Sequence, residues 1–185
     1  MKIFYTASYY GKKTYQQYYN FVLQALKQTR STIISPEIGN YKEVLTPSDL
    51  KRLRYPKKIH YEAIRKGILQ SDAVVIEISH EDFQLGHEAT LAIQSKKYVL
   101  CLSTHEDFSE KINNKYFIAA KYNEYNIEEI VDNFLILVNK NKYSSRFNCF
   151  LTPQQLQYLE SASKKEGINM SEYLRNLIDQ DQENI

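Results

Sequence analysis

The sequence predicts an α/β protein built on a parallel sheet. Segments with strand and helix patterns alternate along the first 140 residues, the order that a doubly wound parallel sheet requires. Residues 73–78 and 98–102 are nearly continuous apolar runs, typical of strands buried on both faces. Only Glu77 interrupts the first run. A buried central sheet covered by helices on both faces accounts for these observations.

Local periodicity places the remaining elements. Apolar residues recur with a helical period in three segments, and Gly, Pro and polar clusters separate them from short apolar strands. The expected elements are strands at 2–7, 32–35, 73–78, 98–102 and 115–122, and helices at 14–28, 59–69 and 127–139. Residues 36–56 hold three Pro and one Gly. A stretch this long within one domain is usually a functional lid or a partly helical insert.

Composition limits the class of protein. The chain has 185 residues, of which 43% are hydrophobic, so it can form a packed core and global disorder is excluded. A net charge of +2 calls for no polyanionic partner. Cys101 and Cys149 form no disulfide framework, which favours a reducing, cytoplasmic setting. We expect neither a signal peptide nor a membrane span, because no apolar run approaches 18 residues.

The four His residues lack the spacing of metal ligands and have no neighbouring Cys. The sequence therefore predicts no metal, and nothing in it calls for an organic cofactor.

Two carboxylates follow the first apolar run. Asp82 lies in the polar loop after this strand, and Gly86 is expected to begin a helix that has Glu88 in its first turn. Chain direction places both at the carboxyl edge of the sheet, where open α/β folds bind ligands. The helix dipole would hold Glu88 ionised there, as a nucleophile at a sugar carbon requires. The same residues also fit an ordinary solvated acidic loop and a first-turn Glu.

Composition changes near residue 140. Residues 141–145 are polar and predict a linker, so the expected division is a main domain at 1–140 and a second segment at 146–185. Phe147, Cys149 and Leu151 alternate with other residues as in a short strand. Thr152 is suited to cap a helix that Pro153 begins and Gly167 ends, and Ser171 to cap a second one.

This strand–helix–turn–helix order resembles the ribbon-helix-helix fold, and GINMSEYLRNLI is similar to the second-helix signature of that family. The resemblance implies that two chains pair their strands, so we expect a homodimer through residues 146–185. It also suggests DNA binding. However, residues 144–185 hold four basic and six acidic side chains, and phosphate contacts need a positive surface. Dimerisation is therefore favoured over DNA binding, and an isolated helical tail is the third alternative.

The main segment also resembles a known family. IFYTASYYGKK, IHYEAIRKGILQSDAVVIEIS, DFQLGHEATLA and KKYVLCL follow one another as in the nucleoside 2-deoxyribosyltransferase superfamily, and most closely its 2′-deoxynucleoside 5′-monophosphate N-glycosidase branch. The resemblance covers residues 1–140. It implies a flavodoxin-like sheet of order 2-1-3-4-5 flanked by helices, with the site between strands 1 and 3.

The resemblance also assigns site residues. It implies that Glu88 attacks C1′ of the sugar and that Asp82 contacts the substrate. The loop after the first strand would bind the 5′ end through Ser8, Tyr9, Tyr10, Gly11 and Lys13. Gly86 belongs to the Gly-x-Glu pattern at the start of the helix and is a further candidate for substrate contact.

The sequence departs from the family pattern at several positions. Gln84 replaces a glycine four residues before the nucleophile, Phe4 replaces a Tyr, and Tyr10 replaces an Arg of the phosphate loop. Glu62 is the only carboxylate near the position of the acid or base, about half a turn away.

These observations favour hydrolysis or transfer at the N-glycosidic bond of a nucleoside or its 5′-monophosphate. A nucleotide-sensing regulator without catalysis and an NAD-type glycohydrolase are the alternatives.

Overall fold

The computed structural model describes residues 1–142 and 147–183. The chain divides into two compact units, Met1–Lys142 and Tyr143–Ile185. Residues 143–146 are not described. Most of the expected linker at 141–145, and the first residue of the second segment, therefore lie outside the described residues.

The first unit contains one parallel sheet of five strands. They are β1 (Lys2–Ala7), β2 (Thr32–Ile34), β3 (Ala73–Glu77), β4 (Tyr98–Ser103) and β5 (Phe117–Lys121). Their order is β2-β1-β3-β4-β5, and every neighbouring pair is parallel. The predicted strand order is therefore confirmed, and the architecture is flavodoxin-like.

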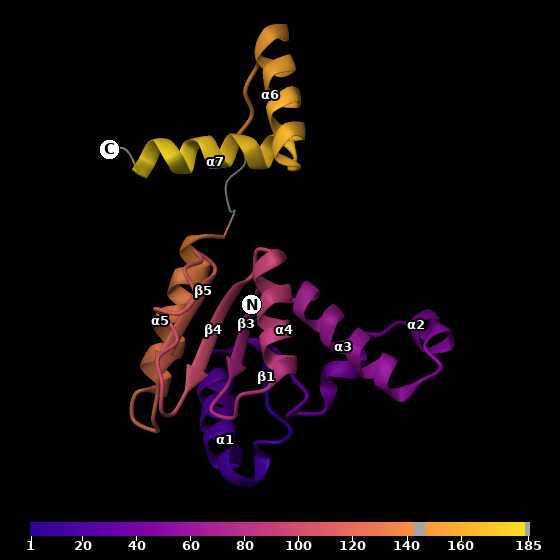
Figure 1. Ribbon diagram of the computed structural model, residues 1–185, viewed down its shortest axis with the longest axis vertical. Helices are drawn as coiled ribbons and strands as arrows, with labels where there is room; N and C mark the ends of the chain where they lie inside the picture. The colour runs from indigo at the N-terminus through magenta and orange to yellow at the C-terminus, as the bar shows by residue number, and fades with distance from the viewer. Residues whose placement is uncertain (143–146, 184–185) are drawn as a thin grey trace. The chain divides into compact units, whose positions relative to one another are not determined.

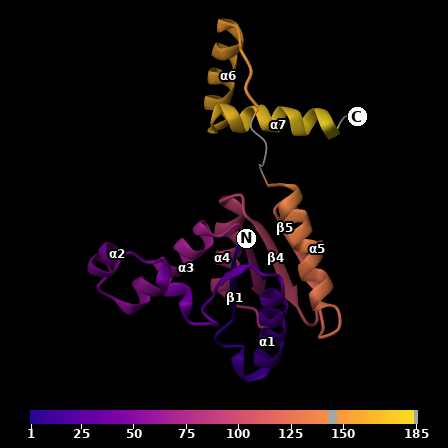
Figure 2. The same ribbon diagram turned by 180° about the vertical axis from the view of Figure 1, so that it is seen from behind.

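Helices cover both faces of this sheet (Figures 1 and 2). α1 (Lys12–Gln28) and α5 (Ile127–Lys140) lie on one face, and α3 (Pro56–Gln70) and α4 (Phe83–Gln94) lie on the other. The short helix α2 (Pro47–Arg52) lies away from the sheet, beyond α3 (Figure 1). A short 3₁₀ helix, η1 (Asn40–Val44), precedes α2, so the long segment before α3 is a partly helical insert. A capping box between Thr46 and Asp49 closes the start of α2.

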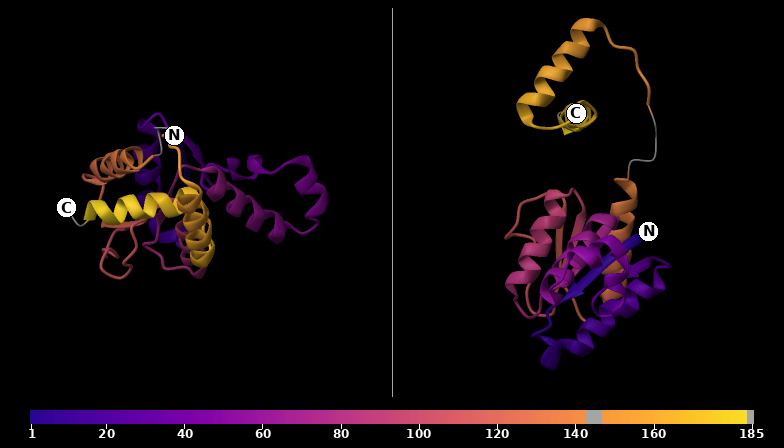
Figure 3. Two further views of the ribbon diagram at one scale, coloured as in Figure 1. Left: turned by 90° about the horizontal axis from the view of Figure 1, so that it is seen from above. Right: turned by 90° about the vertical axis from the view of Figure 1, so that its right-hand side faces the viewer.

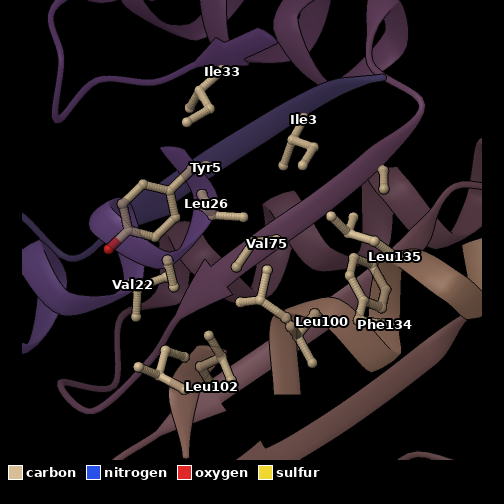
Figure 4. Close-up of a cluster of buried hydrophobic side chains, with 14 of the residues drawn as sticks. Ile3, Tyr5, Val22, Leu26, Ile33, Val75, Leu100, Leu102, Phe134 and Leu135 are labelled. Carbon is tan, nitrogen blue, oxygen red and sulfur yellow. The ribbon is translucent and has the colours of Figure 1, made fainter. Parts of the chain in front are cut away.

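Side chains alternate between the two faces along each strand. Tyr5 and Val75 point to the face covered by α1 and α5, where they pack with Val22 and Phe134 (Figure 4). The neighbouring strand residues point to the other face, where Ile64 and Ile68 of α3 and Leu85 of α4 contribute. The sheet is therefore buried on both sides, as its continuous apolar strands predict.

Gly67 allows α3 to approach the sheet closely. A Cβ atom added to Gly67 would lie 2.6 Å from Cε2 of Phe4, well inside contact distance. This close approach brings the N-terminal part of α3 beside α4, and the two helices lie side by side in both main views (Figures 1 and 2).

The second unit contains α6 (Pro153–Glu166) and α7 (Met170–Glu183), drawn in orange and yellow (Figure 3). Thr152 and Gln155 form a capping box, and Gly167 ends α6 with φ of 70°, as the sequence predicts. The second cap differs from the prediction: Asn169, not Ser171, accepts a hydrogen bond from the backbone N–H of Glu172. Leu159 and Tyr173 are buried between the helices.

Residues 147–152 have no regular secondary structure in the single chain. A strand there would need a partner strand for its backbone groups, and the described residues of one chain provide none. The predicted ribbon therefore stays a prediction.

Candidate functional site

Two neighbouring pockets lie beside the carboxyl ends of β1 and β3. The larger one, of about 860 Å³, is lined by residues of η1, α3 and α4. The smaller one, of about 470 Å³, is lined by the end of β1, the loop after it and Asp82. Tyr41, His60 and Gln84 line both pockets and form the wall between them.

Asp82 lines the smaller pocket and meets Ser8, which lies 74 positions away in the chain. Ser8 is buried and lies outside the linings of both pockets. The Ser8 hydroxyl donates to Oδ2 of Asp82 at 2.9 Å, and the backbone N–H of Gln84 donates to Oδ1 at 2.9 Å. Asp82 is therefore the N-cap of α4, because its side chain accepts from the first turn. Its carboxylate connects the loop after β1 to the helix that carries Glu88.

The position of Glu88 in α4 corrects the sequence-based expectation. The helix begins at Phe83, three residues before Gly86, so Glu88 belongs to the second turn and not the first. The helix dipole acts mainly within the first turn, and it does not hold this carboxyl ionised. Instead, burial raises the pKa of Glu88 to about 7, and the nearby Asp82 carboxylate also raises it.

Glu88 is buried at the edge of the larger pocket, with 1% of its surface exposed. The Gln84 side-chain amide donates to Oε1 at 2.7 Å. Among the residues that the structure describes, none is hydrogen-bonded to Oε2. The Gln84 hydrogen bond and the Thr6 hydroxyl lower the pKa of Glu88 against the effect of burial. The free oxygen is the kind of group that a ligand would complete.

Only some of the predicted residues in the loop after β1 line a pocket. Tyr9 and Tyr10 line the smaller pocket and are largely exposed, whereas Lys13 is exposed and lies outside the linings of both pockets. Lys12 lines the smaller pocket instead, and its Nζ pairs with Glu37 at 2.9 Å. Gly11 is buried, and a Cβ atom added to it would collide with the Tyr19 hydroxyl and with His80.

Two further sequence candidates lie elsewhere. Gly86 is exposed on α4 and lines a different pocket, with nothing within 4 Å of where its Cβ would be. Glu62 is held by Arg65, whose Nη2 lies 2.7 Å from Oε1 and whose Nε lies 3.0 Å from Oε2. The hydrogen bonds from Arg65 hold the pKa of Glu62 below its usual range. The structure therefore does not bring Glu62 to Glu88 as a proton donor.

Sequence reasoning missed the residues that form the wall between the two pockets. His60 and Tyr41 are joined by a hydrogen bond of 2.9 Å between Nδ1 and the phenolic oxygen. Gln84 was noted only as a departure from the family glycine. The sole sequence signal for Tyr41 was the length of the insert that carries it, because no local pattern shows that the insert folds over α3.

The larger pocket has aromatic walls. The rings of Tyr61 and His87 are stacked, with centroids 6.0 Å apart and an interplanar angle of 26°. Phe83 is 94% exposed on the same wall, and Lys42 and Lys57 supply positive charge at the rim. Exposed aromatic faces suit a flat ligand, and the pocket volume lies in the range of small-molecule sites.

Within residues 1–142 and 147–183, no group of three or more His, Cys, Asp or Glu side chains converges as metal ligands would. In the same residues, no helix is both long enough and apolar enough to cross a bilayer.

Comparisons with known proteins add one finding. No protein-family model and no curated protein matches the sequence. The CMP N-glycosidase BcmB of Clostridium botulinum is similar in structure, with a TM-score of 0.50 and 10% identity over 71% of this chain and 98% of that chain. The two proteins share a fold. Smu.1420 of Streptococcus mutans also matches, with a TM-score of 0.35 and 12% identity over 76% of this chain and 96% of that chain.

Proposed function

We propose that the protein cleaves or transfers the N-glycosidic bond of a nucleoside or a nucleoside 5′-monophosphate. The observation that carries this proposal is the Glu88 carboxyl, which is buried at the edge of a pocket of about 860 Å³ and has one oxygen without a hydrogen-bond partner among the described residues. The fold shared with a CMP N-glycosidase supports the same chemistry.

In this mechanism Glu88 attacks the anomeric carbon through its free oxygen. A C–O bond forms, the C–N bond breaks, and the base leaves with the electron pair and takes up a proton. Water then cleaves the glycosyl-enzyme in a hydrolase, whereas a second base does so in a transferase. Asp82 would contact the sugar from the smaller pocket, which it lines.

The aromatic wall of the larger pocket suits the base. Tyr61 and His87 present a stacked pair, and stacking on a purine or pyrimidine ring needs only an exposed aromatic face. The sugar would then lie near Glu88, between the two pockets, with its 5′ end directed to the loop after β1.

A regulator that binds a nucleotide without cleaving it is the second candidate. One observation favours it: Glu88 is the only carboxyl among the described residues that line the larger pocket. Glu62 lies outside this lining and accepts hydrogen bonds from Arg65. A second carboxyl that donates a proton to the leaving base is therefore not present in that pocket.

The deciding experiment uses the full chain and a panel of ribonucleosides, deoxyribonucleosides, their 5′-monophosphates and NAD. Chromatography measures free base, and calorimetry measures binding. We expect base release from at least one nucleoside or monophosphate and none from the Glu88→Gln variant, which keeps the side-chain shape without the charge. Loss of the nucleophile should reduce the rate by several orders of magnitude.

Glu129→Gln is the matched control, because Glu129 is exposed on α5 at the other face of the sheet. Tight binding without base release would favour the regulator. Release from NAD alone would indicate the NAD-type glycohydrolase. Near-normal turnover by Glu88→Gln would refute the role of Glu88.

A further inference from the structure

One atom of Gln84 faces two titratable groups. Its side-chain nitrogen Nε2 lies 2.7 Å from Oε1 of Glu88 and 3.3 Å from Nε2 of His60. The other ring nitrogen of His60, Nδ1, lies 2.9 Å from the hydroxyl of Tyr41. A chain of contacts therefore runs from η1 through α3 to the carboxyl on α4, along the wall shared by the two pockets.

The hydrogen atoms in this chain are constrained by the chemistry of its members. An amide nitrogen has two hydrogens and only donates, and an ionised carboxylate only accepts. When Gln84 donates to both neighbours, Nε2 of His60 must carry a lone pair. A neutral imidazole then has its proton on Nδ1, where it donates to the Tyr41 hydroxyl.

Protonation of Glu88 reverses the arrangement. A proton on Oε1 needs an acceptor, which Gln84 supplies when its amide turns and directs its oxygen toward Glu88 and His60. His60 must then carry a proton on Nε2. A proton on Oε2 would instead have no hydrogen-bond partner among the described residues. Mixed arrangements set donor against donor or acceptor against acceptor, which is costly at Glu88 because this carboxyl is 1% exposed.

We propose that Gln84 is a positioning residue that couples the protonation of Glu88 to the tautomer of His60. The carboxylate form of Glu88 goes with a proton on Nδ1 of His60, and the carboxylic acid form goes with a proton on Nε2. The role of Glu88 as nucleophile rests on the proposed function, but the coupling itself does not.

Burial and the positive charges around His60 favour the neutral ring. Lys42 from η1 faces it, and Lys57 and Arg65 from α3 line the same pocket. Burial and the Lys42 charge lower the pKa of His60. Asp82 lines the smaller pocket, which His60 also lines. A neutral ring can change tautomer without any change in charge, so the switch at His60 needs no ionisation of its own.

The groups around Glu88 have opposing effects on its ionisation. Asp82 and burial favour its protonated form, whereas Thr6 of β1 and Gln84 favour the carboxylate. His87 lines the same pocket from α4. Removing the Gln84 hydrogen bond should therefore raise the pH at which Glu88 ionises, by about one unit, since a hydrogen bond to a charged group has that strength.

The test is NMR on the full chain without ligand. Long-range ¹H–¹⁵N spectra report which ring nitrogen of each His carries the proton, and ¹³C spectra of the Glu carboxyls report the ionisation of Glu88. The His60→Phe and Glu88→Gln variants assign the two signals. We expect the proton of His60 to move from Nε2 to Nδ1 as the pH rises, with the same midpoint as Glu88.

Gln84→Met keeps the length of the side chain without its hydrogen bonds. In this variant we expect the His60 tautomer to stop following Glu88 and the midpoint of Glu88 to rise. Gln94→Met is the matched control, because Gln94 is exposed near the end of the same helix. Gln84→Asn, whose shorter amide does not reach both partners, should lose the coupling as well.

A His60 tautomer that stays fixed while Glu88 titrates would overturn the proposal, and so would a Gln84→Met variant that retains the switch. These readouts need no catalysis. If the switch is present but the protein releases no base from any substrate, the coupling stands and the proposed function fails.

Discussion

At the scale of single residues, two buried carboxyls lie on opposite faces of the sheet. Glu88 lies at the edge of the larger pocket, whereas Glu77, at the end of β3, is fully buried on the face of α1 and α5. Glu77 accepts hydrogen bonds from the hydroxyls of Ser79 and Tyr122. Burial raises the pKa of each carboxyl to about 7, but of the two only Glu88 lines one of the two pockets described above.

The raised pKa of Glu88 determines how activity should depend on pH. A nucleophile must be ionised, so we expect the value of kcat/KM to increase about tenfold per pH unit below pH 7 and to level off above it. The measurement is a profile of base release between pH 5 and pH 9 with substrate well below KM. A profile that declines from pH 5 to pH 7 would contradict the need for a carboxylate.

The raised pKa of Glu77 makes the free energy of unfolding depend on pH. The folded-state pKa of Glu77, about 7, exceeds the ordinary value of 4.5. The contribution of Glu77 to the free energy of unfolding is therefore fully present below pH 4.5 and is lost as the pH rises through 7. Between these values the folded state binds more protons than the unfolded state, so the free energy of unfolding falls by up to about 1.4 kcal/mol per pH unit.

Glu77→Gln should remove this contribution and make the slope less steep by up to about 1.4 kcal/mol per pH unit, because Gln does not ionise. The Glu88 carboxyl, whose pKa is also raised to about 7, keeps its own contribution in this variant. Urea unfolding of both proteins at pH 5, 6, 7 and 8 measures it. An unchanged slope in the variant would show that Glu77 is not the group responsible.

The two lysines after β1 give a matched pair. Lys12 lines the smaller pocket, whereas Lys13 lies outside the linings of both pockets. We expect Lys12→Ala to reduce the preference for a 5′-monophosphate over its nucleoside by roughly tenfold, consistent with one charge-assisted contact. Lys13→Ala should leave the preference unchanged. Calorimetry with the monophosphate and the nucleoside measures this preference. Equal effects of the two variants would exclude that the 5′ end of the ligand lies in the smaller pocket.

At the scale of elements, the packing of α3 against the sheet positions His60 opposite α4. Gly67 is required for this approach, because its missing side chain leaves room for the Phe4 ring. Gly67→Ala should therefore lower the free energy of unfolding by about 1–3 kcal/mol through overpacking.

Gly86→Ala is the control for this prediction. Gly86 also lies within a helix, but nothing is within 4 Å of its added Cβ, so the change should stabilise by up to about 1 kcal/mol. Urea unfolding measures both variants. Equal effects would show that the Phe4 contact does not restrict α3.

At the scale of the whole molecule, the second unit leaves large apolar side chains exposed. Phe147 is 87% exposed, Phe150 is fully exposed, and Leu177 and Ile178 are partly exposed. A unit of two helices rarely buries enough apolar surface alone. We therefore propose that residues 146–185 pair with the same residues of a second chain, as ribbon-helix-helix segments do.

Light scattering tests this proposal. The full chain should have the mass of a dimer, or of a higher even-numbered oligomer, at micromolar concentration. A chain that lacks residues 144–185 should have a lower mass and keep the fold of the first unit, which circular dichroism checks. A monomeric full chain would contradict the pairing. Strong, sequence-selective binding to duplex DNA would instead favour the regulator, despite the acidic charge of the segment.

The sequence by itself determined the strands of the sheet and the helices that pack on it, but not the bounds of η1 and α2 in the insert. Continuous apolar strands and helical periodicity are local properties, and chain direction then places Asp82 at the carboxyl edge of the sheet. Helix ends with strong caps, such as Thr152 and Gly167, were predicted correctly, because a cap depends only on neighbouring residues. The start of α4 was misplaced by three residues, since Asp82 was interpreted as a ligand-binding residue and is also the cap.

Only the tertiary structure decided which residues connect to Glu88 through Gln84. His60 lies 28 positions and Tyr41 47 positions before Glu88 in the printed sequence, and no pattern predicts that the insert and α3 fold against α4. Burial likewise depends on every element that packs around a group, so the pKa of Glu88 follows from the assembled fold and not from its place in the helix. The same holds for Glu62, whose partner Arg65 is near in sequence but whose distance from Glu88 is set by the packing of α3.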